Sequence, residues 1–105
     1  MSLSLVARLL GPGNGLSSGV YGVRIDDVNG DGQKEIWCGD AAGHLYLFQR
    51  LAGTFRCVFR SDDLAPYVGY HNNLFPIKNG AGKTVRLAAV SPGYVMLFSV
   101  KWWLL

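Results

Sequence analysis

The stretch "NGDGQKEIWCGDAAGHLYLF", residues 29–48, decides the fold, because much of it recurs farther along the chain. Sliding the sequence by 50 residues lays "NGDGQKE" (29–35) over "NGAGKTV" (79–85). The same offset lays "GHLYLF" (43–48) over "GYVMLF" (93–98). Self-similarity at a fixed period of this size predicts a repeat architecture. The identical pairs at this offset are Gly19/Gly69, Asn29/Asn79, Gly30/Gly80, Gly32/Gly82, Gly43/Gly93, Leu47/Leu97 and Phe48/Phe98.

Both copies are patterned as short β-strands separated by turns. Runs rich in β-branched and aromatic residues alternate with clusters of Gly, Asn and Asp, which is typical of strands and the turns between them. A unit of about 50 residues with four antiparallel strands has the size of a β-propeller blade. The expected fold class is all-β, with two four-stranded antiparallel propeller-type blades. The expected strands are 20–26, 35–40, 44–51, 55–61, 70–77, 84–90 and 94–100.

The chain has the length of one domain. Its 105 residues are 50% hydrophobic, which is enough for a packed core. Within this single domain we assign residues 11–61 to the first blade repeat and residues 62–105 to a second, degenerate repeat. The segment "SDDLAPYVG" (61–69) would link the outermost strand of the first blade to the innermost strand of the second.

Charge and hydropathy argue against several classes of partner. The net charge of +3 comes from singly scattered Lys and Arg, so we expect no nucleic-acid binding. No apolar stretch approaches the roughly 20 residues of a membrane-spanning helix, so we expect no membrane insertion. Arg8 interrupts the apolar start, and we expect no signal peptide. Cys38 and Cys57 lack metal-ligand or redox spacing, and their state is left open.

The segment "KNGAGKTV" (78–85) contains Gly82-Lys83-Thr84, which ends like a phosphate-binding loop of the form G-x-x-x-x-G-K-[ST]. That loop requires a leading Gly at position 77, which is Ile77, and a helix directly after the Thr. The residues that follow are β-branched and show no helical periodicity. We therefore interpret this segment as the second copy of the turn that contains "NGDGQK".

The segment "IDDVNGDGQKEIWCGDAAGHLYLF" (25–48) resembles an FG-GAP repeat, also called a VCBS or integrin-type propeller repeat. The hallmark of that family is a D-x-[DN]-x-D-G-x-x-[DE] loop followed by an apolar strand, a Gly turn and a second strand. The resemblance covers most of residues 20–98 and implies a propeller that recognises glycan or protein ligands outside the cell or at its surface. The first copy matches the loop at Asp27, Asn29, Asp31, Gly32 and Glu35.

The chemistry of this loop points to calcium (Ca²⁺). Calcium takes six to eight oxygen ligands, which carboxylates and amide carbonyls at alternate positions of a tight loop supply. An EF-hand would need a Glu at the twelfth position, which is Cys38, and flanking helices. A polar hairpin turn is the alternative, but its clustered acids would repel each other without a cation. The predicted ligands are Asp27, Asn29, Asp31, the backbone carbonyl of Gln33, and Glu35.

The second copy of the loop lacks most of these ligands. Ile77 and Ala81 stand where the first copy has Asp, which leaves Asn79 as the only aligned ligand type. Lys78 and Lys83 disfavour a cation further. We therefore predict about one calcium site per chain, in the first loop.

Catalytic motifs are absent from the sequence, and we predict that the chain is not an enzyme. His44 is expected to begin a strand and face solvent, and Asp62-Asp63 to be a solvated pair. A glycan-active enzyme domain is a weaker alternative, as is a purely structural propeller fragment. Aromatic residues that could stack on sugars, or pack in the core instead, are Trp37, Tyr46, Tyr70, His71, Tyr94, Trp102 and Trp103.

One strand precedes the first repeat, and the second repeat lacks its own outer strand. The run "LVARLL" (5–10) is in register at the 50-residue offset with "FRCVFR" (55–60). Two blades cannot close a propeller. We therefore predict a cyclic head-to-tail homo-oligomer, most simply three chains making six blades, in which residues 5–10 complete the second blade of a neighbour. The alternatives are a piece of a longer propeller and a monomeric β-sandwich.

Overall fold

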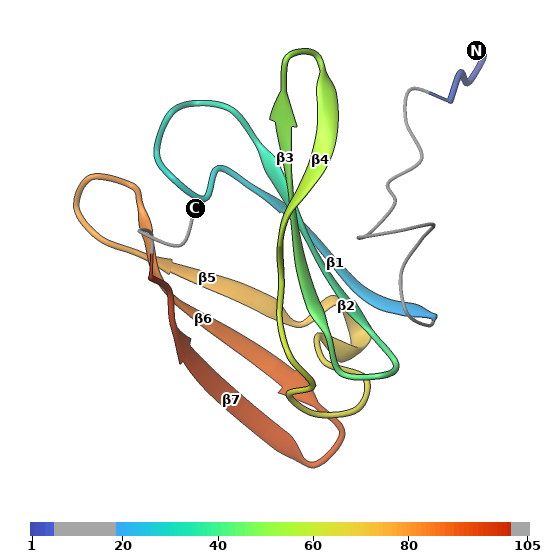
Figure 1. Cartoon of the computed structure of the whole chain (residues 1–105), viewed down its shortest axis with the longest axis vertical. Helices are drawn as coiled ribbons and strands as arrows, with labels where there is room; N and C mark the ends of the chain where they lie inside the picture. Colours follow the sequence, from blue (N-terminus) through green and yellow to red (C-terminus); the bar gives the residue numbers. More distant parts are fainter. Residues whose placement is uncertain (6–18, 102–105) are drawn as a thin grey trace.

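The computed structural model of the chain describes residues 1–5 and 19–101. These residues form two antiparallel β-sheets and no α-helix (Figure 1). No helix in this part of the chain is long and apolar enough to cross a membrane. Sheet A has the order β1 (Val20–Asp26), β2 (Glu35–Asp40), β3 (Leu45–Leu51), β4 (Thr54–Arg60), and sheet B has the order β5 (Leu74–Lys78), β6 (Thr84–Ser91), β7 (Tyr94–Ser99).

The strand predictions are confirmed to within about a residue at each end, apart from the one for residues 70–77. Tyr70–Asn72 forms a 3-10 turn, and β5 starts only at Leu74. His71 and Asn72 have φ angles of 56° and 63°, and Gly69 before them has a φ of 78°. Backbone with positive φ cannot lie in an extended strand, so the chain turns here before it enters sheet B.

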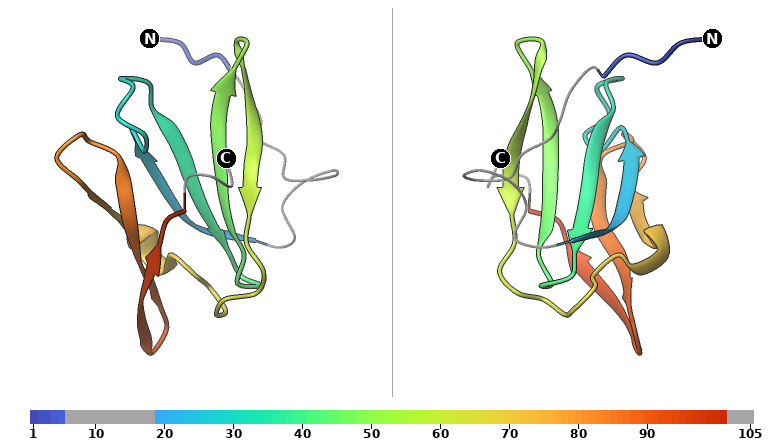
Figure 2. Two further views of the ribbon diagram at one scale, coloured as in Figure 1. Left: turned by 60° about the vertical axis from the view of Figure 1, so that its left-hand side comes forward. Right: turned by 90° about the vertical axis from the view of Figure 1, so that its right-hand side faces the viewer.

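The two sheets pack face to face over one shared apolar core (Figures 1 and 2). Alternate residues of a strand point to the same face, which is why Trp37 and Leu47 of sheet A face Leu87 of sheet B. Burial of this apolar surface holds the sheets together. The buried members of this core are Val28, Trp37, Leu45, Leu47, Val68, Leu74, Leu87 and Ala89.

The link from β4 to sheet B, residues 61–69, lies directly against β1 and β2. A Cβ added at Gly39 would stand 1.8 Å from the carbonyl oxygen of Val68, and one at Gly22 would stand 2.1 Å from that of Gly69. The Gly69 N–H donates to the carbonyl of Val90 on β6 at 2.9 Å. Two glycines on sheet A therefore let the link pass and reach sheet B.

The hairpin of β6 and β7 has a different register from the hairpin of β2 and β3. Trp37 pairs with Leu47 in sheet A, whereas Leu87, its equivalent at the 50-residue offset, pairs with Phe98 in sheet B. A shift of one residue moves a side chain to the other face of a sheet. Leu47 is accordingly 1% exposed and Leu97 61% exposed, so the sequence pairs Leu47/Leu97 and Phe48/Phe98 are not structurally equivalent.

Sheet A contains four strands, as predicted, and sheet B contains three in the described part of the chain. The outer strand predicted at residues 5–10 cannot be placed, since residues 6–10 lie outside the described ranges. Leu5 is 76% exposed and belongs to no strand. Both sheets have the predicted strand order and direction. That they are propeller blades stays a prediction.

Candidate metal centre

The loop between β1 and β2 is organised around the carboxylate of Asp27. This carboxylate accepts hydrogen bonds from the backbone N–H groups of Gly30 (2.9 Å), Asp31 (3.2 Å) and Gly32 (2.8 Å). Gly30 and Gly32 have φ angles of 78° and 86°, a backbone conformation that glycine adopts without strain. These N–H groups, led by that of Gly32, hold the pKa of Asp27 below its usual value.

The next two predicted ligands, Asn29 and Asp31, fold the tip of the loop. The Asn29 Oδ1 accepts from the Asp31 N–H at 3.3 Å, and the Asp31 Oδ1 accepts from the Gln33 N–H at 2.8 Å. Gln33 is exposed, and its N–H rather than its carbonyl takes part in these hydrogen bonds. Short side-chain-to-backbone hydrogen bonds of this kind are the ones that Asn and Asp make in turns.

Glu35 closes the loop from inside the protein. It is the first residue of β2, it is 1% exposed, and its Oε1 accepts from the Val28 N–H at 3.0 Å. Burial raises the pKa of Glu35, and the negative charges of Asp31 and Asp27 raise it further. A buried carboxylate that resists ionisation is one that a bound cation would stabilise in its charged form.

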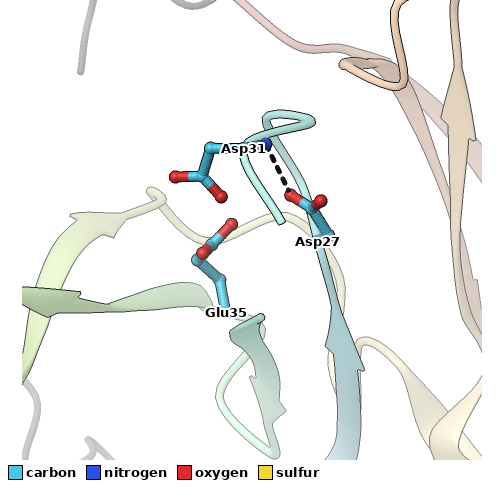
Figure 3. Close-up of side chains that lie close together, drawn as sticks. All are labelled: Asp27, Asp31 and Glu35. Carbon is cyan, nitrogen blue, oxygen red and sulfur yellow. Dashed lines mark hydrogen bonds between the residues drawn. The ribbon is translucent and has the colours of Figure 1, made fainter. Parts of the chain in front are cut away.

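Three of the five predicted ligands converge. One carboxylate oxygen each from Asp27, Asp31 and Glu35 lies within 4.8 Å of the other two. Calcium–oxygen distances are about 2.3–2.6 Å, so oxygens on opposite sides of one calcium ion are separated by roughly 5 Å. Figure 3 shows the carboxylates of Asp31 and Glu35 pointing toward one another, with Asp27 beside them. The three carboxylates are therefore close enough together to contact a single metal ion, and calcium, with Asn29 and Gln33 as further ligands, stays a prediction.

The second loop, residues 79–83, lies alongside the first. The Thr84 N–H donates to the carbonyl of Val28 at 2.7 Å. The Lys78 Nζ donates to the Asp27 carbonyl at 2.6 Å and lies 2.9 Å from the Asp26 Oδ2. The ammonium group of Lys78 thus sits at the base of the first loop, next to the acidic cluster.

The second loop is closed by an amide instead of a carboxylate. The Asn79 Oδ1 accepts from the N–H groups of Ala81 (2.9 Å) and Lys83 (3.1 Å), and the Asn79 carbonyl accepts from Gly82 (3.0 Å). Thr84 begins β6 directly after this turn. The segment is therefore a hairpin turn, and the helix that a phosphate loop requires does not follow it.

The prediction that His44 faces solvent is wrong. The His44 side chain is 12% exposed, its Nε2 lies 2.6 Å from the Asp63 Oδ1, and its Nδ1 lies 3.5 Å from the Asp40 Oδ2. Asp63 is exposed as expected, but it is engaged with this ring. The turn before β3 is short enough to place His44 over the buried Asp40, which the apolar pattern of the strand does not reveal.

Asp40 is a buried polar residue that the sequence analysis missed. It is 0% exposed, and its carboxylate accepts from the N–H groups of Gly43 and His44 (both 2.9 Å) and from the Tyr46 hydroxyl (2.8 Å). An Asp that precedes a short Gly-containing turn is a signal for such a cap, since its side chain bonds to the backbone of the turn. Its observed contacts are those of a structural residue.

The candidate sugar-stacking residues divide into buried and exposed sets. Trp37 and Tyr46 are 4% and 0% exposed, so of the two alternatives these residues pack in the core. Tyr70 packs against His71 with ring centroids 4.0 Å apart, and Tyr94 is 62% exposed. Trp102 and Trp103 lie outside the described residues.

No protein-family model, no curated protein and no solved structure matches this chain. The FG-GAP resemblance of the first loop therefore stays a prediction from residues 25–48.

Proposed function

We propose that this chain is a calcium-binding, β-propeller-type recognition module that acts outside the cell or at its surface. The observation that carries the proposal is the convergence of Asp27, Asp31 and Glu35 at one end of sheet A. Hard oxygen donors grouped on a short loop are the ligand set that calcium prefers. Magnesium demands near-ideal octahedral geometry, and a loop that offers ligands from alternate residues suits the more tolerant calcium ion better.

The acidic cluster is more than the turn itself requires. The neighbouring loop closes with the neutral amide of Asn79 as its hydrogen-bonding hub. Three carboxylates held together in the first loop repel each other at neutral pH, and one of them, Glu35, is also buried. A bound cation would offset both costs and stiffen the connection between β1 and β2.

The recognition role is supported by exposed aromatic side chains at the link between the sheets. Tyr67 is 39% exposed, and its ring lies 6.3 Å from that of Tyr70, which packs on His71. Aromatic faces of this kind stack on sugar rings and on protein side chains. We propose that glycan or protein ligands bind here, and that other copies of the chain complete the propeller as a homo-oligomeric ring.

Isothermal titration calorimetry with calcium tests the metal proposal. We expect about one site per chain in the wild type and a loss of binding in Asp31→Asn, which removes a charge and retains an Oδ1 acceptor for the Gln33 N–H. Asp62→Asn is the matched control, because Asp62 is an exposed acid of the link. Two sites per chain, absence of binding to the wild type, or unchanged binding in Asp31→Asn would each contradict the proposal.

A glycan array probed in the presence of calcium tests the choice of ligand. Binding that is reduced in Tyr70→Ala and unchanged in Tyr94→Ala, which removes an exposed ring at the β6–β7 turn, would support a lectin with its site at the link. A blank array with the calcium-loaded protein would contradict the glycan ligand and favour a protein partner.

A further inference from the structure

The outer edge of sheet B is an open strand. In sheet A, β4 pairs with β3 and completes the sheet, whereas β7, which has the position of β3, has no further strand beside it in the described part of the chain. The Val100 N–H donates to the carbonyl of Val85 on β6 at 3.0 Å. Because hydrogen-bonded partners alternate along an antiparallel ladder, the backbone groups of Val95 and Leu97 point away from β6. These groups form a template for another strand.

An apolar cleft lies beside this edge. It has a volume of about 170 Å³ and lies between the end of β4, the core and the C-terminal end of β7. Cavities of about 150 Å³ accommodate a benzene ring, so the cleft can hold one large aliphatic or aromatic side chain. Its apolar lining residues include Trp37, Leu45, Phe59, Leu87, Phe98 and Val100.

Trp37 supplies an independent sign that a neighbour is missing. It lines the cleft and is 4% exposed, yet its indole N–H has no acceptor among the described residues. A buried donor without an acceptor destabilises a protein. The side chains of β7 that point outward are also unusually exposed for apolar residues, with Val95 at 80% and Leu97 at 61%.

We infer that β7 accepts an extended segment of a second copy of this chain, residues 4–10, as the fourth strand of sheet B. At the 50-residue offset these residues align with β4, Thr54–Arg60, which fills the corresponding position in sheet A. Phe59 of β4 pairs with Leu47, so the aligned Leu9 would lie opposite Phe98 and beside the cleft. The inference rests on the proposed assembly of copies, and does not depend on calcium.

The position of the chain's own start favours pairing between copies. Residues 1–5 lie apart from β7 of their own copy and belong to no strand (Figures 1 and 2). Leu3 and Leu5 are 93% and 76% exposed, which leaves them available to a partner. Strand addition to an open edge gives affinity through the backbone and specificity through alternate side chains, here through the cleft.

Light scattering on the full chain and two variants of Leu97 tests the edge. Leu97→Pro removes the N–H that faces the partner, and Leu97→Thr removes the same apolar side chain but keeps that N–H. We expect the wild type and Leu97→Thr to be oligomeric, and Leu97→Pro to be monomeric with an unchanged circular dichroism spectrum. A monomeric wild type, or an oligomer that Leu97→Pro leaves intact, would overturn the inference.

Disulfide trapping identifies the donor segment and does not depend on how well Leu97→Pro folds. Phe48 pairs with Cys57 in sheet A, which places Ala7 opposite Ser99 in the proposed pair. Chains with Ala7→Cys and chains with Ser99→Cys, differently tagged in a Cys57→Ser background, are mixed and oxidised. A disulfide between the two tags supports the inference, and its absence overturns it. Neither test changes a predicted metal ligand. If calorimetry showed no calcium binding, the light-scattering and disulfide results would therefore still decide the inference.

Discussion

The two loops that join the first and second strands of each sheet occupy the same place in the repeat and differ in chemistry. In sheet A, Asp26 pairs with Glu35 and the loop spans residues 27–34. In sheet B, Lys78 pairs with Thr84 and the loop is shortened to residues 79–83. The shorter loop shows that a single Asn is enough to organise a turn at this position. The longer loop uses three acids instead, each of which accepts a backbone N–H, and under our proposal these acids would also hold a cation.

The largest expected effect breaks the comparison at a strand position near the far ends of β2 and β6. Gly39 of sheet A aligns with the buried Ala89 of sheet B, but only at Gly39 does the link approach closely enough to exclude a Cβ. We expect Gly39→Ala to lower the free energy of unfolding by roughly 3 kcal/mol or more, because a backbone carbonyl must move. The reverse change, Ala89→Gly, should cost about 1 kcal/mol. Urea unfolding measures both, and equal losses would contradict this account of the link.

Replacement of the hub residue of each loop compares the two turns without metal. Asp27→Ala leaves three backbone N–H groups without their carboxylate, and Asn79→Ala leaves two without their amide oxygen. We expect Asn79→Ala to lower the free energy of unfolding by about 1 kcal/mol, and Asp27→Ala to lower it further, because one more backbone N–H group loses its acceptor.

Urea unfolding in the presence of a chelator gives these two values, and the same measurement with calcium separates the loops. Calcium at a hundred times its dissociation constant should stabilise Asn79→Ala and the wild type alike, by about 2.7 kcal/mol. If calcium stabilised Asp27→Ala to the same extent, Asp27 would not be a calcium ligand.

The pH dependence of stability sharpens the contrast between the buried Glu35 of the first loop and the neutral Asn79 of the second loop. Burial and the neighbouring acids raise the pKa of Glu35 above its ordinary value of 4.5. As the pH rises past that value, the unfolded chain loses this proton while the folded chain keeps it, so stability falls until Glu35 ionises in the folded state as well. In the presence of a chelator, the stability of Glu35→Gln should not fall in this way. Unfolding profiles that coincide with the wild type between about pH 4 and 7 would contradict it.

The smallest expected effect concerns the contact between the two loops. Lys78 and Asp26 are 32% and 20% exposed at the side chain, so their ion pair is partly screened by solvent. We expect Lys78→Gln to cost about 0.5–1 kcal/mol in stability. Because a positive charge beside the acidic cluster is removed, calcium should bind somewhat more tightly. Weaker calcium binding in the calorimeter would show that Lys78 supports the loop more than it repels the ion.

Much of the fold was predictable because strands and turns are encoded by residues close together in the sequence. The alternation around Trp37 and the Gly-containing turns gave the extent of β1 and β2 and the direction of all seven strands. The turn at Tyr70–Asn72 was missed because His71 and Asn72 adopt positive φ values that their residue types do not demand. The Asn72 Oδ1 accepts a hydrogen bond from the Val23 N–H of β1 at 3.1 Å, which is a tertiary contact that the local sequence does not reveal.

The candidate site shows the same division between local and tertiary information. The three acids of residues 27–35 were found from spacing, and they converge. The contact of Lys78 with Asp26, 52 residues away, was invisible, since it arises from the packing of one loop on the other. The engagement of His44 with Asp63 was missed for a related reason, because the link folds back over the turn before β3.

The two-residue turn at Pro92–Gly93 between the paired residues Ser91 and Tyr94 limits how far knowledge of one repeat transfers to the other. An alignment by identity equates the buried Leu47 with the exposed Leu97. It would wrongly predict that Leu47, in the core of sheet A, tolerates the polar substitutions that Leu97 tolerates on the surface of sheet B. A substitution profile measured along β7 must be moved by one position before it describes β3. For a protein built from duplicated hairpins, the length of a turn decides which residues of the two copies can be compared.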